Sequence, residues 1–421
     1  MAILLGAIAD DFTGATDLSN ILIRSGVNVV QTVGIPGTSF DPGTAEAIVV
    51  ALKSRTVPAD VAVARSLTAL RWLRAMGARQ FYFKYCSTFD STAEGNIGPV
   101  ADALLEDLRE NFALICPAFP ANSRTVYMGH LFVGNELLSD TSMKDHPLTP
   151  MRDSNIVRMI NSQSRHRAGL VGYDAVSGGV EAIESAIVAL RREGFTYAVA
   201  DALSDDHLAS IGKAAKSHRL ITGGSALAFG LAENLRREGL LGPPKKPQMP
   251  QINGTAAVLA GSCSKATREQ IGNWKCAGRA SLKLDVDRIA SDAESVLEVI
   301  EWTERFVDQP VLIYSSDNPT EVAALQKKYG GEQVSAAIET AMGTIANGLV
   351  DRGRRRLILA GGETAGAVVS ALAVTGLKIG PEIDLGVPWT ETIDQPRIAL
   401  ALKSGNFGGE DFFVRALAMF P

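Results

Sequence analysis

A glycine-rich loop at residues 359–366 is the segment of this chain whose residue types most clearly suggest chemistry. It reads L-A-G-G-E-T-A-G: an apolar run ends at Gly361 and Gly362, and a helix-like apolar pattern begins directly after the loop. A strand, a glycine turn and a helix N-terminus together present bare backbone N–H groups to a phosphate. A tight turn also needs glycine for steric reasons, so this loop alone leaves both interpretations open.

Three other segments share this design. Residues 223–225 (G-G-S), 261–265 (G-S-C-S-K) and 403–409 (K-S-G-N-F-G-G) each follow a short apolar run. Small hydroxyl groups beside glycines either cap helices or bind phosphate and ribose oxygens, and loops on neighbouring strands can converge on one ligand. The pattern therefore predicts a nucleotide or phosphate site. Its candidate residues are Ser262, Ser264, Gly361, Gly362, Glu363, Thr364, Lys403, Gly405 and Asn406.

Two adjacent carboxylates, Asp10 and Asp11, follow the first apolar run of the chain and precede a helical pattern. The carboxyl ends of strands are where α/β enzymes hold their catalytic groups. Adjacent residues of an extended strand point to opposite faces, so we expect one of the two to face a site. That carboxylate could orient an attacking hydroxyl group and accept its proton. Thr13 and Asp17 could cap or charge the first helical turn.

Cations and hydroxyl groups follow the next expected strands of the same half. Residues 52–55 read L-K-S-R, and residues 84–92 read K-Y-C-S-T-F-D-S-T. Cations suit a carboxylate and hydroxyl groups suit the alcohols of a small polyhydroxy acid, although Arg55 alone could equally form a surface ion pair. We expect Lys84 to act as a catalytic cation. The candidate substrate-binding residues are Lys53, Arg55, Ser87, Thr88, Asp90 and Ser91.

Alternating strands and helices would position these residues. The expected strands are 3–9, 27–33, 47–51, 80–84, 112–116, 168–172, 197–201, 219–222, 256–260, 282–284, 310–315 and 357–360, and the expected helices are 13–25, 58–76, 97–111, one from 266, 291–306 and 333–352. This alternation predicts βαβ units and largely parallel sheets between helices. Residues 119–153 are expected to be irregular, and residues 354–356 (R-R-R) to form a solvated turn.

A chain of 421 residues is long for one hydrophobic core. Residues 239–254 contain four prolines, interrupt the alternation and predict an interdomain linker. The expected organisation is an N-terminal domain at 1–238, the linker at 239–254 and a C-terminal domain at 255–421. The fold class is α/β, with two domains that each contain a largely parallel sheet flanked by helices, and with the active site in the cleft between them.

Composition narrows the classes of function. A net charge of −5 argues against nucleic acid as the main partner, and the apolar runs are too short to span a membrane. The chain starts without a basic segment, so no signal peptide is expected. Its four cysteines lack C-x-x-C spacing and its five histidines lack H-x-x-x-H spacing, so neither a zinc site nor a disulfide framework is expected and a reducing cytoplasm fits.

Five segments together resemble the four-carbon acid sugar kinase family. They are I-A-D-D-F-T-G-A-T-D at 8–17, F-K-Y-C-S-T-F-D-S-T at 83–92, G-S-C-S at 261–264, A-G-G-E-T at 360–364 and L-K-S-G-N-F-G at 402–408. The resemblance covers residues 8–413. It implies phosphorylation of the O-4 hydroxyl group of a four-carbon acid sugar by ATP with Mg²⁺, the sugar being a 3-oxo-tetronate or, alternatively, D-threonate or D-erythronate.

The resemblance also implies where the ligands bind. The N-terminal domain would bind the acid sugar at Asp10, Asp11, Arg55 and residues 84–91, and the C-terminal domain would bind ATP. Carried over residue by residue, the nucleotide contacts fall on Ser264, residues 361–364 and Gly405. The sequence leaves the oligomeric state open, with a homodimer as one alternative.

Two other classes of protein share parts of this pattern. A dinucleotide-dependent dehydrogenase would need a G-x-G-x-x-G turn, which the loop at 359–366 lacks, just as it lacks the Lys-Ser/Thr pair of a P-loop. A non-catalytic sugar-acid-binding protein with two α/β lobes is usually exported, and no signal peptide is expected here. Both alternatives therefore rank below the kinase.

Overall fold

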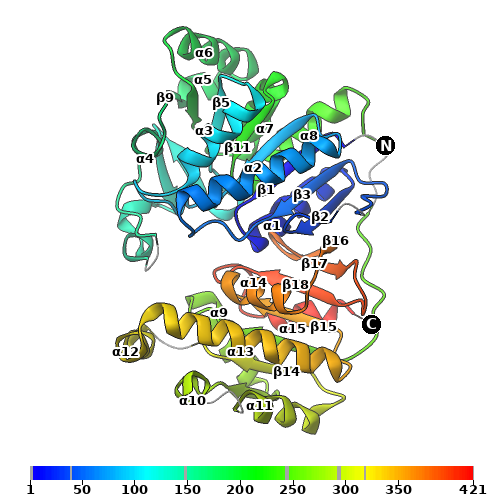
Figure 1. Ribbon diagram of the computed structural model, residues 1–421. Helices are drawn as coiled ribbons and strands as arrows, with labels where there is room; N and C mark the ends of the chain where they lie inside the picture. The colour runs from blue at the N-terminus through cyan, green and yellow to red at the C-terminus, as the bar shows by residue number, and fades with distance from the viewer. Residues whose placement is uncertain are drawn as a thin grey trace. The chain divides into compact units, whose positions relative to one another are not determined.

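The computed structural model describes residues 3–37, 40–146, 149–241, 246–291, 295–316 and 319–420. The chain divides into two compact units, Met1–Lys246 and Pro247–Pro421, which are each built from strands and helices (Figure 1). Residues 242–245 of the expected linker and residues 292–294 of one expected helix lie outside the described residues. Within the described part of the chain, no helix is both long enough and apolar enough to cross a membrane.

The first unit is built on a sheet of eight parallel strands in the order β2-β3-β1-β4-β11-β5-β10-β9. Its strands are β1 Leu5–Ala9, β2 Val29–Val33, β3 Ala47–Ala51, β4 Gln80–Lys84, β5 Ala113–Cys116, β9 Ala168–Val171, β10 Tyr197–Ala200 and β11 Leu220–Gly223. The central strands are nearly continuous apolar runs, as expected for strands covered on both faces. The largely parallel sheet predicted for this half is confirmed.

Helices connect these strands. They are α1 Phe12–Arg24, α2 Ala59–Ala75, α3 Ile97–Leu108, α4 Ile156–Gln163, α5 Tyr173–Ser177, α6 Val180–Arg192, α7 Asp205–Ala214 and α8 Ala228–Arg237. Helix α1 shows why the sequence folds this way locally. Asp11 caps its N-terminus by accepting a hydrogen bond from the backbone N–H of Gly14 at 3.0 Å, and Leu18, Ile21 and Leu22 are buried at helical spacing.

The order of the strands brings three loops together at one edge of this sheet. The chain runs from β1 to β2 and β3 on one side, then crosses to β4 on the other side of β1. Ala9, the last residue of β1, pairs with Ala51 at the end of β3 and with Lys84 at the end of β4. Ligands bind where the direction of strand addition reverses in this way, at the carboxyl ends of the strands.

The prediction of an irregular segment at 119–153 is wrong. The structure has a three-stranded antiparallel sheet there: β6 Arg124–Tyr127, β7 His130–Val133 and β8 Glu136–Leu137. The turn between β6 and β7 consists of Met128 and Gly129, both with positive φ (49° and 73°). A two-residue hairpin turn needs positive φ values, which Asn-Gly, Asp-Gly and Gly-Gly pairs usually provide. Methionine rarely adopts a positive φ, so the sequence did not predict this turn.

The second unit contains the sheet β13-β14-β12-β15-β18-β17-β16. Its strands are β12 Ala256–Ala260, β13 Ser281–Lys283, β14 Val311–Tyr314, β15 Arg356–Ala360, β16 Gly376–Asp384, β17 Val387–Thr392 and β18 Ala399–Lys403. The pairings from β13 to β18 are parallel, as predicted, whereas β17 pairs antiparallel with both β18 and β16. The hairpin of β16 and β17 was not predicted.

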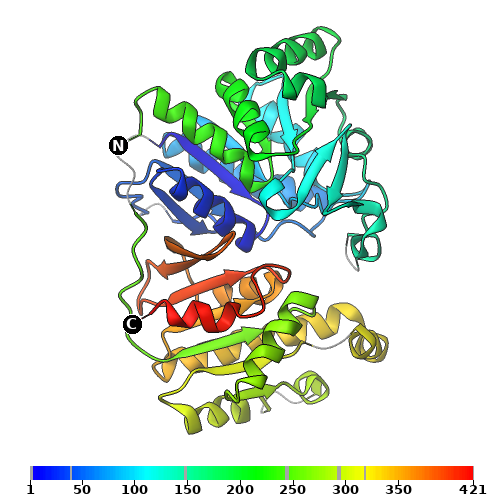
Figure 2. The same cartoon turned by 180° about the vertical axis from the view of Figure 1, so that it is seen from behind.

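Helices cover both faces of this second sheet. They are α9 Lys265–Cys276, α10 Val286–Ser291, α11 Ser295–Thr303, α12 Pro319–Tyr329, α13 Gly331–Asp351, α14 Gly362–Ala371 and α15 Phe412–Ala418. Helices α13 and α14 lie on one face (Figure 1), and α9 and α15 lie on the other (Figure 2). Trp274, Trp389, Phe412 and Phe413 fill the core between the sheet and α9 and α15.

The expectation of a solvated turn at 354–356 is wrong for Arg354. Its side chain is buried, and its guanidinium group donates hydrogen bonds to the backbone carbonyl groups of residues 256, 303, 306 and 309 at 2.7 to 3.2 Å. Arg354 therefore ties the start of β15 to the neighbouring strand and loops. A buried arginine that satisfies backbone acceptors looks the same in sequence as a solvated one.

Candidate functional site

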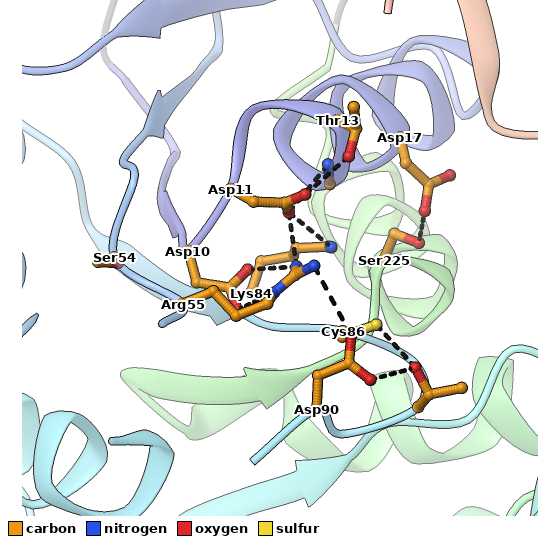
Figure 3. Close-up of polar contacts among 12 residues, drawn as sticks. Asp10, Asp11, Thr13, Asp17, Ser54, Arg55, Lys84, Cys86, Asp90 and Ser225 are labelled. Carbon is orange, nitrogen blue, oxygen red and sulfur yellow. Dashed lines mark hydrogen bonds and ion pairs between the residues drawn. The ribbon is translucent and has the colours of Figure 1, made fainter. Parts of the chain in front are cut away.

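A cluster of charged side chains lies at the carboxyl edge of the first sheet (Figure 3). Asp10 and Asp11 follow β1, Arg55 follows β3, and Lys84 ends β4. Arg55 Nε and Nη2 donate to the two carboxylate oxygens of Asp10 at 2.8 Å each, and Nη2 also donates to Asp11 Oδ1 at 2.6 Å. The Arg55 side chain is only 22% exposed, so this ion pair belongs to a partly enclosed site rather than to the open surface.

Asp11 receives donors from several directions. Thr13 Oγ1 donates to Asp11 Oδ2 at 2.7 Å, and Lys84 Nζ lies 3.9 Å from Asp11 Oδ1. The Asp11 side chain is 21% exposed, whereas that of Asp10 is 6% exposed. Asp11 is therefore the carboxylate of the pair that a ligand can reach.

The two carboxylates differ in acidity. Burial raises the pKa of Asp10, and Arg55 offsets this only in part. Burial also acts to raise the pKa of Asp11, but the charges of Arg55 and Lys84 and the hydrogen bond from Thr13 outweigh it and lower this pKa below its usual value. Asp11 is therefore ionised at neutral pH. Neighbouring carboxylates with pKa values displaced in opposite directions are typical of catalytic sites.

The loop after β4 adds polar groups to the cluster. Thr88 Oγ1 donates to Asp90 Oδ1 at 2.6 Å, Cys86 Sγ lies 2.9 Å from Thr88 Oγ1, and Asp90 Oδ2 lies 3.8 Å from Arg55 Nη1. Phe89 and Asp90 have positive φ values of 64° and 23°, which are unfavourable for residues with a side chain. Strained backbone of this kind is concentrated at ligand sites, where the surrounding structure holds it in place.

The structure gathers some of the predicted substrate-binding residues and not others. Arg55, Thr88 and Asp90 join the cluster, and Ser87 lies partly exposed in the same loop. Ser91 Oγ instead accepts a hydrogen bond from Gln163 of α4 at 2.9 Å. The Lys53 side chain is exposed, and the hydrogen bond that Arg65 donates to Lys53 involves its backbone carbonyl group.

Gly223 and Gly224 have a steric role. A Cβ atom on Gly223 would lie 2.3 Å from the carbonyl oxygen of Cys116, and one on Gly224 would lie 2.6 Å from that of Pro117. Ser225 Oγ donates to the carboxylate of Asp17 in α1. This loop therefore packs parts of the first unit together.

Three glycine loops of the second unit meet at the carboxyl ends of β12, β15 and β18, which are neighbours in the sheet. The backbone N–H of Ser262 donates to the Ala360 carbonyl group at 3.1 Å, and that of Gly361 donates to the Lys403 carbonyl group at 2.8 Å. Ser264 Oγ donates to the Gly405 carbonyl group at 2.6 Å. Three segments that lie far apart in the sequence thus form one connected surface.

The glycines of this surface leave room for hydroxyl groups. A Cβ atom on Gly261 would lie 2.1 Å from Thr364 Oγ1, and one on Gly405 would lie 2.3 Å from Ser262 Oγ. Gly361 has a φ of +127°, which side-chain-bearing residues rarely adopt. Glycine at these positions therefore follows from close approach and from backbone conformation.

Two helices begin at this surface. Ser264 caps α9, and Gly361 precedes α14. Helix N-termini carry partial positive charge and unpaired N–H groups, which together favour phosphate. Gly362 and Glu363 are exposed in the first turn of α14, and Asn406 is exposed in the third loop. All the predicted nucleotide-binding residues thus come from the three loops, although Lys403 is fully buried among them.

The buried side chain of Lys403 stabilises the loop at 403–409. Its Nζ donates to the carbonyl groups of Ser404, Gly405 and Phe407 at 2.8 to 3.2 Å and to Thr267 Oγ1 at 3.0 Å. Burial lowers the pKa of Lys403 to about 7. Its ammonium group therefore holds loop carbonyls in place and is not presented at the surface.

Two residues of α9 that stabilise the loop at 403–409 were not among the predicted site residues. Thr267 Oγ1 donates to the Gly405 carbonyl group at 2.9 Å, and Gln270 Nε2 donates to the carbonyl groups of residues 407, 408 and 409 at 3.0 to 3.1 Å. A signal was present, because Ser264, Thr267 and Gln270 are spaced by three residues and share one face of a helix.

Comparisons with known proteins match two domains of this chain. A family described as "Sugar-binding N-terminal domain" matches residues 5–231, and one described as "Nucleotide-binding C-terminal domain" matches residues 257–413. The chain is 53% identical to a protein of Cupriavidus necator and 51% identical to one of Burkholderia multivorans, each named 3-oxo-tetronate kinase, over 98% of this chain and 96% of the relative. A crystal structure from Salmonella typhimurium LT2 is 41% identical, with a TM-score of 0.87 over the full length of both chains.

Sequence identity of 51 to 53% over almost the whole chain establishes the family to which it belongs. The chain belongs to the four-carbon acid sugar kinase family, as its five motifs implied. It is therefore an enzyme, and its second unit carries a nucleotide-binding domain.

Proposed function

We propose that this kinase transfers the γ-phosphoryl group of ATP to the O-4 hydroxyl group of 3-oxo-tetronate. The observation that carries the proposal is the identity of 51 to 53%, over 98% of the chain, to relatives named for that activity. The four cysteines are free, which favours a cytoplasmic location. The matched domains support binding of the sugar by the first unit and of the nucleotide by the second.

In this proposal the sugar binds to the charged cluster of the first unit, which consists of Asp10, Asp11, Arg55, Lys84 and Asp90 and is called the acid cluster below. Phosphoryl transfer needs the nucleophile and the phosphate to be positioned and their charge neutralised. Asp11 would accept a hydrogen bond from O-4 and later its proton, because it is ionised and is the more accessible carboxylate. Arg55 would hold Asp10 and Asp11 in place, and Lys84 would offset charge that develops at the transferred group.

The three glycine loops of the second unit would bind ATP. The backbone N–H of Gly362, in the first turn of α14, would contact a phosphate oxygen, because that of Gly361 is already bonded to the Lys403 carbonyl group. Ser262 and Thr364 would be hydroxyl donors, with Ser264 beside them. Among the described residues, no group of three or more His, Cys, Asp or Glu side chains is arranged to hold a metal ion. Mg²⁺ would bind the phosphates of ATP and neutralise their charge, and Glu363 is the acidic side chain of the loop at 361–364.

A panel of substrates tests this proposal. ADP release is measured with purified protein, ATP and Mg²⁺ in the presence of 3-oxo-tetronates, D-threonate and D-erythronate. We expect the highest kcat/KM with a 3-oxo-tetronate, and phosphorus NMR of the product should show a phosphate ester at O-4. A preference for D-threonate or D-erythronate would move the chain to a different substrate within the family. ATP turnover that no acid sugar stimulates would contradict the proposal.

A further inference from the structure

Arg124 is a cation that the motifs of the chain did not single out. It begins β6, the first strand of the small antiparallel sheet. Its backbone exchanges two hydrogen bonds with Phe119, at 2.8 and 3.0 Å, and Phe119 follows β5 by three residues. Two further bonds, between Val126 and Ala202, fix β6 beside the end of β10. Arg124 is thus fixed at the same carboxyl edge of the parallel sheet that carries the acid cluster.

The guanidinium group of Arg124 is poorly satisfied. Its Nη1 donates to the carbonyl group of Asn122, whereas its Nε is buried without a hydrogen-bond partner. In the described part of the chain, Arg124 forms no ion pair. Burial lowers the pKa of Arg124, and the charge of the Asp90 carboxylate acts against this shift. A half-buried cation without an anion is costly for the protein unless a ligand supplies the anion.

The other cations of the cluster are placed differently. Arg55 Nε and Nη2 are bonded to Asp10 and Asp11, and its Nη1 lies 3.8 Å from Asp90 Oδ2. Lys84 Nζ lies 3.9 Å from Asp11 and packs against the first turn of α1 at Gly14. A second anion brought next to Asp10 and Asp11 would be repelled by both carboxylates. The carboxylate of an acid sugar therefore fits best away from this pair.

We propose that Arg124 binds the carboxylate of the acid sugar through its Nε and Nη2 atoms and so directs the opposite end of the sugar toward Asp11. Nη1 remains bonded to Asn122, which fixes the plane of the guanidinium group. The Nε–Nη2 side of an arginine presents two parallel N–H groups at the spacing of a carboxylate. This proposal rests on the proposed function. It makes Arg124 the residue that distinguishes an acid sugar from a neutral sugar.

Kinetics of Arg124→Gln, Arg124→Lys and a control variant, Arg191→Gln, test the proposal. Arg191 is exposed at the end of α6, at the opposite edge of the sheet. We expect Arg124→Gln to raise the KM for the acid sugar about 30-fold or more, as expected when one partner of an enclosed charge pair is truncated. Arg124→Lys should give a smaller increase, because it keeps the charge and loses the paired N–H groups. The KM for ATP should stay unchanged in every variant.

Thermal stability separates binding from a structural role. Without ligand, Arg124→Gln should melt at the temperature of the wild type or above it, because the change removes an unpaired, half-buried charge. The acid sugar alone should raise the melting temperature of the wild type and of Arg191→Gln, but not that of Arg124→Gln at the same concentration. A lower melting temperature for ligand-free Arg124→Gln would overturn the proposal in favour of a structural role.

Other outcomes are equally decisive. An unchanged KM for the acid sugar in Arg124→Gln would overturn the proposal, as would an increased KM for ATP, which would assign Arg124 to the phosphates. Failure of the proposed function has a different signature, because the wild type would then phosphorylate no four-carbon acid sugar. In that case the melting-temperature shifts with 3-oxo-tetronate and D-threonate still decide whether Arg124 binds a sugar acid.

Discussion

Arg55 donates hydrogen bonds to both carboxylate oxygens of Asp10 at 2.8 Å and so forms a bidentate ion pair with it. The same guanidinium group reaches Asp11, so one cation holds two adjacent like charges together. Because Asp10 and Asp11 come from the turn after β1 and Arg55 comes from the turn after β3, this pair also fixes two loops relative to each other. Removal of the Arg55 guanidinium group should therefore affect both the stability of these two turns and the pKa values of the two carboxylates.

Arg55→Gln should therefore destabilise the protein in a pH-dependent manner. At pH 7.5 two carboxylates would face each other without their cation, and we expect a loss of about 1–3 kcal/mol in the free energy of unfolding. As the pH falls toward 5 and the carboxylates gain protons more readily in the variant, the loss should shrink. Urea unfolding of wild type and variant at both pH values measures this. An equal loss at both pH values would mean that charge repulsion is not the cause.

Asp11→Asn should lower kcat by about 10²–10⁴-fold while the fold survives, because asparagine caps helices about as well as aspartate but cannot accept a proton. Asp10→Asn should have a smaller effect on kcat and a larger one on stability, since Asp10 is bonded to Arg55 through both oxygens. Steady-state kinetics and melting temperatures of the two variants are compared side by side. A near-parental kcat for Asp11→Asn, with a large loss for Asp10→Asn, would assign the proton acceptor to Asp10.

Gly361→Ala should weaken ATP binding by about tenfold or more. The φ of +127° at this position is strained for any residue with a Cβ atom, and the added carbon would lie 3.1 Å from the backbone nitrogen of Ser262. Gly272→Ala in α9 is the matched control, because no atom lies within 4 Å of its added Cβ and alanine favours helix. Calorimetric titration with ATP measures both affinities. Equal affinities would remove the Gly361 turn from the nucleotide site.

Lys403→Met should change how stability depends on pH. The pKa of Lys403 is about 7 in the folded protein and near 10.5 when unfolded, so between these values the unfolded chain binds more protons. This group therefore makes the free energy of unfolding rise as the pH increases from 7 toward 10. Chemical denaturation at pH 7, 8 and 9 should show the stability of the wild type, relative to Lys403→Met, increasing with pH. A constant difference would contradict the assigned pKa.

The parallel core and the family could be predicted from the sequence because both depend on local signals. The strands at 47–51, 80–84 and 256–260 were predicted to the residue, since an apolar run bounded by turn residues has few other solutions. The five motifs sit at the carboxyl ends of strands, and the order of the strands in each sheet then brings their loops together. The site residues themselves remain predictions until the variants above are measured.

Other features depended on long-range contacts that the sequence does not display. Arg354 is buried among carbonyl groups of distant segments, and buried Lys403 bonds the hydroxyl group of Thr267 in α9 as well as carbonyl groups of its own loop. Met128 adopts a turn conformation that its residue type does not favour, which hid the hairpin of β6 and β7. Arg124 lies outside every motif, and only the position of β6 beside the ends of β5 and β10 brings it to the carboxyl edge of the sheet, which also carries the acid cluster. Such placement is a property of the tertiary structure.

The position of β11 has a consequence for how the first unit is made. This strand, Leu220–Gly223, is the last of its sheet in sequence, yet it lies between β4 and β5, which precede it by more than a hundred residues. During synthesis β4 and β5 therefore emerge long before the strand that joins them. A ribosome-bound chain that ends before residue 220 has two separate groups of strands, with the acid cluster on one and Arg124 on the other. The sheet that carries both becomes continuous only when its final strand is inserted.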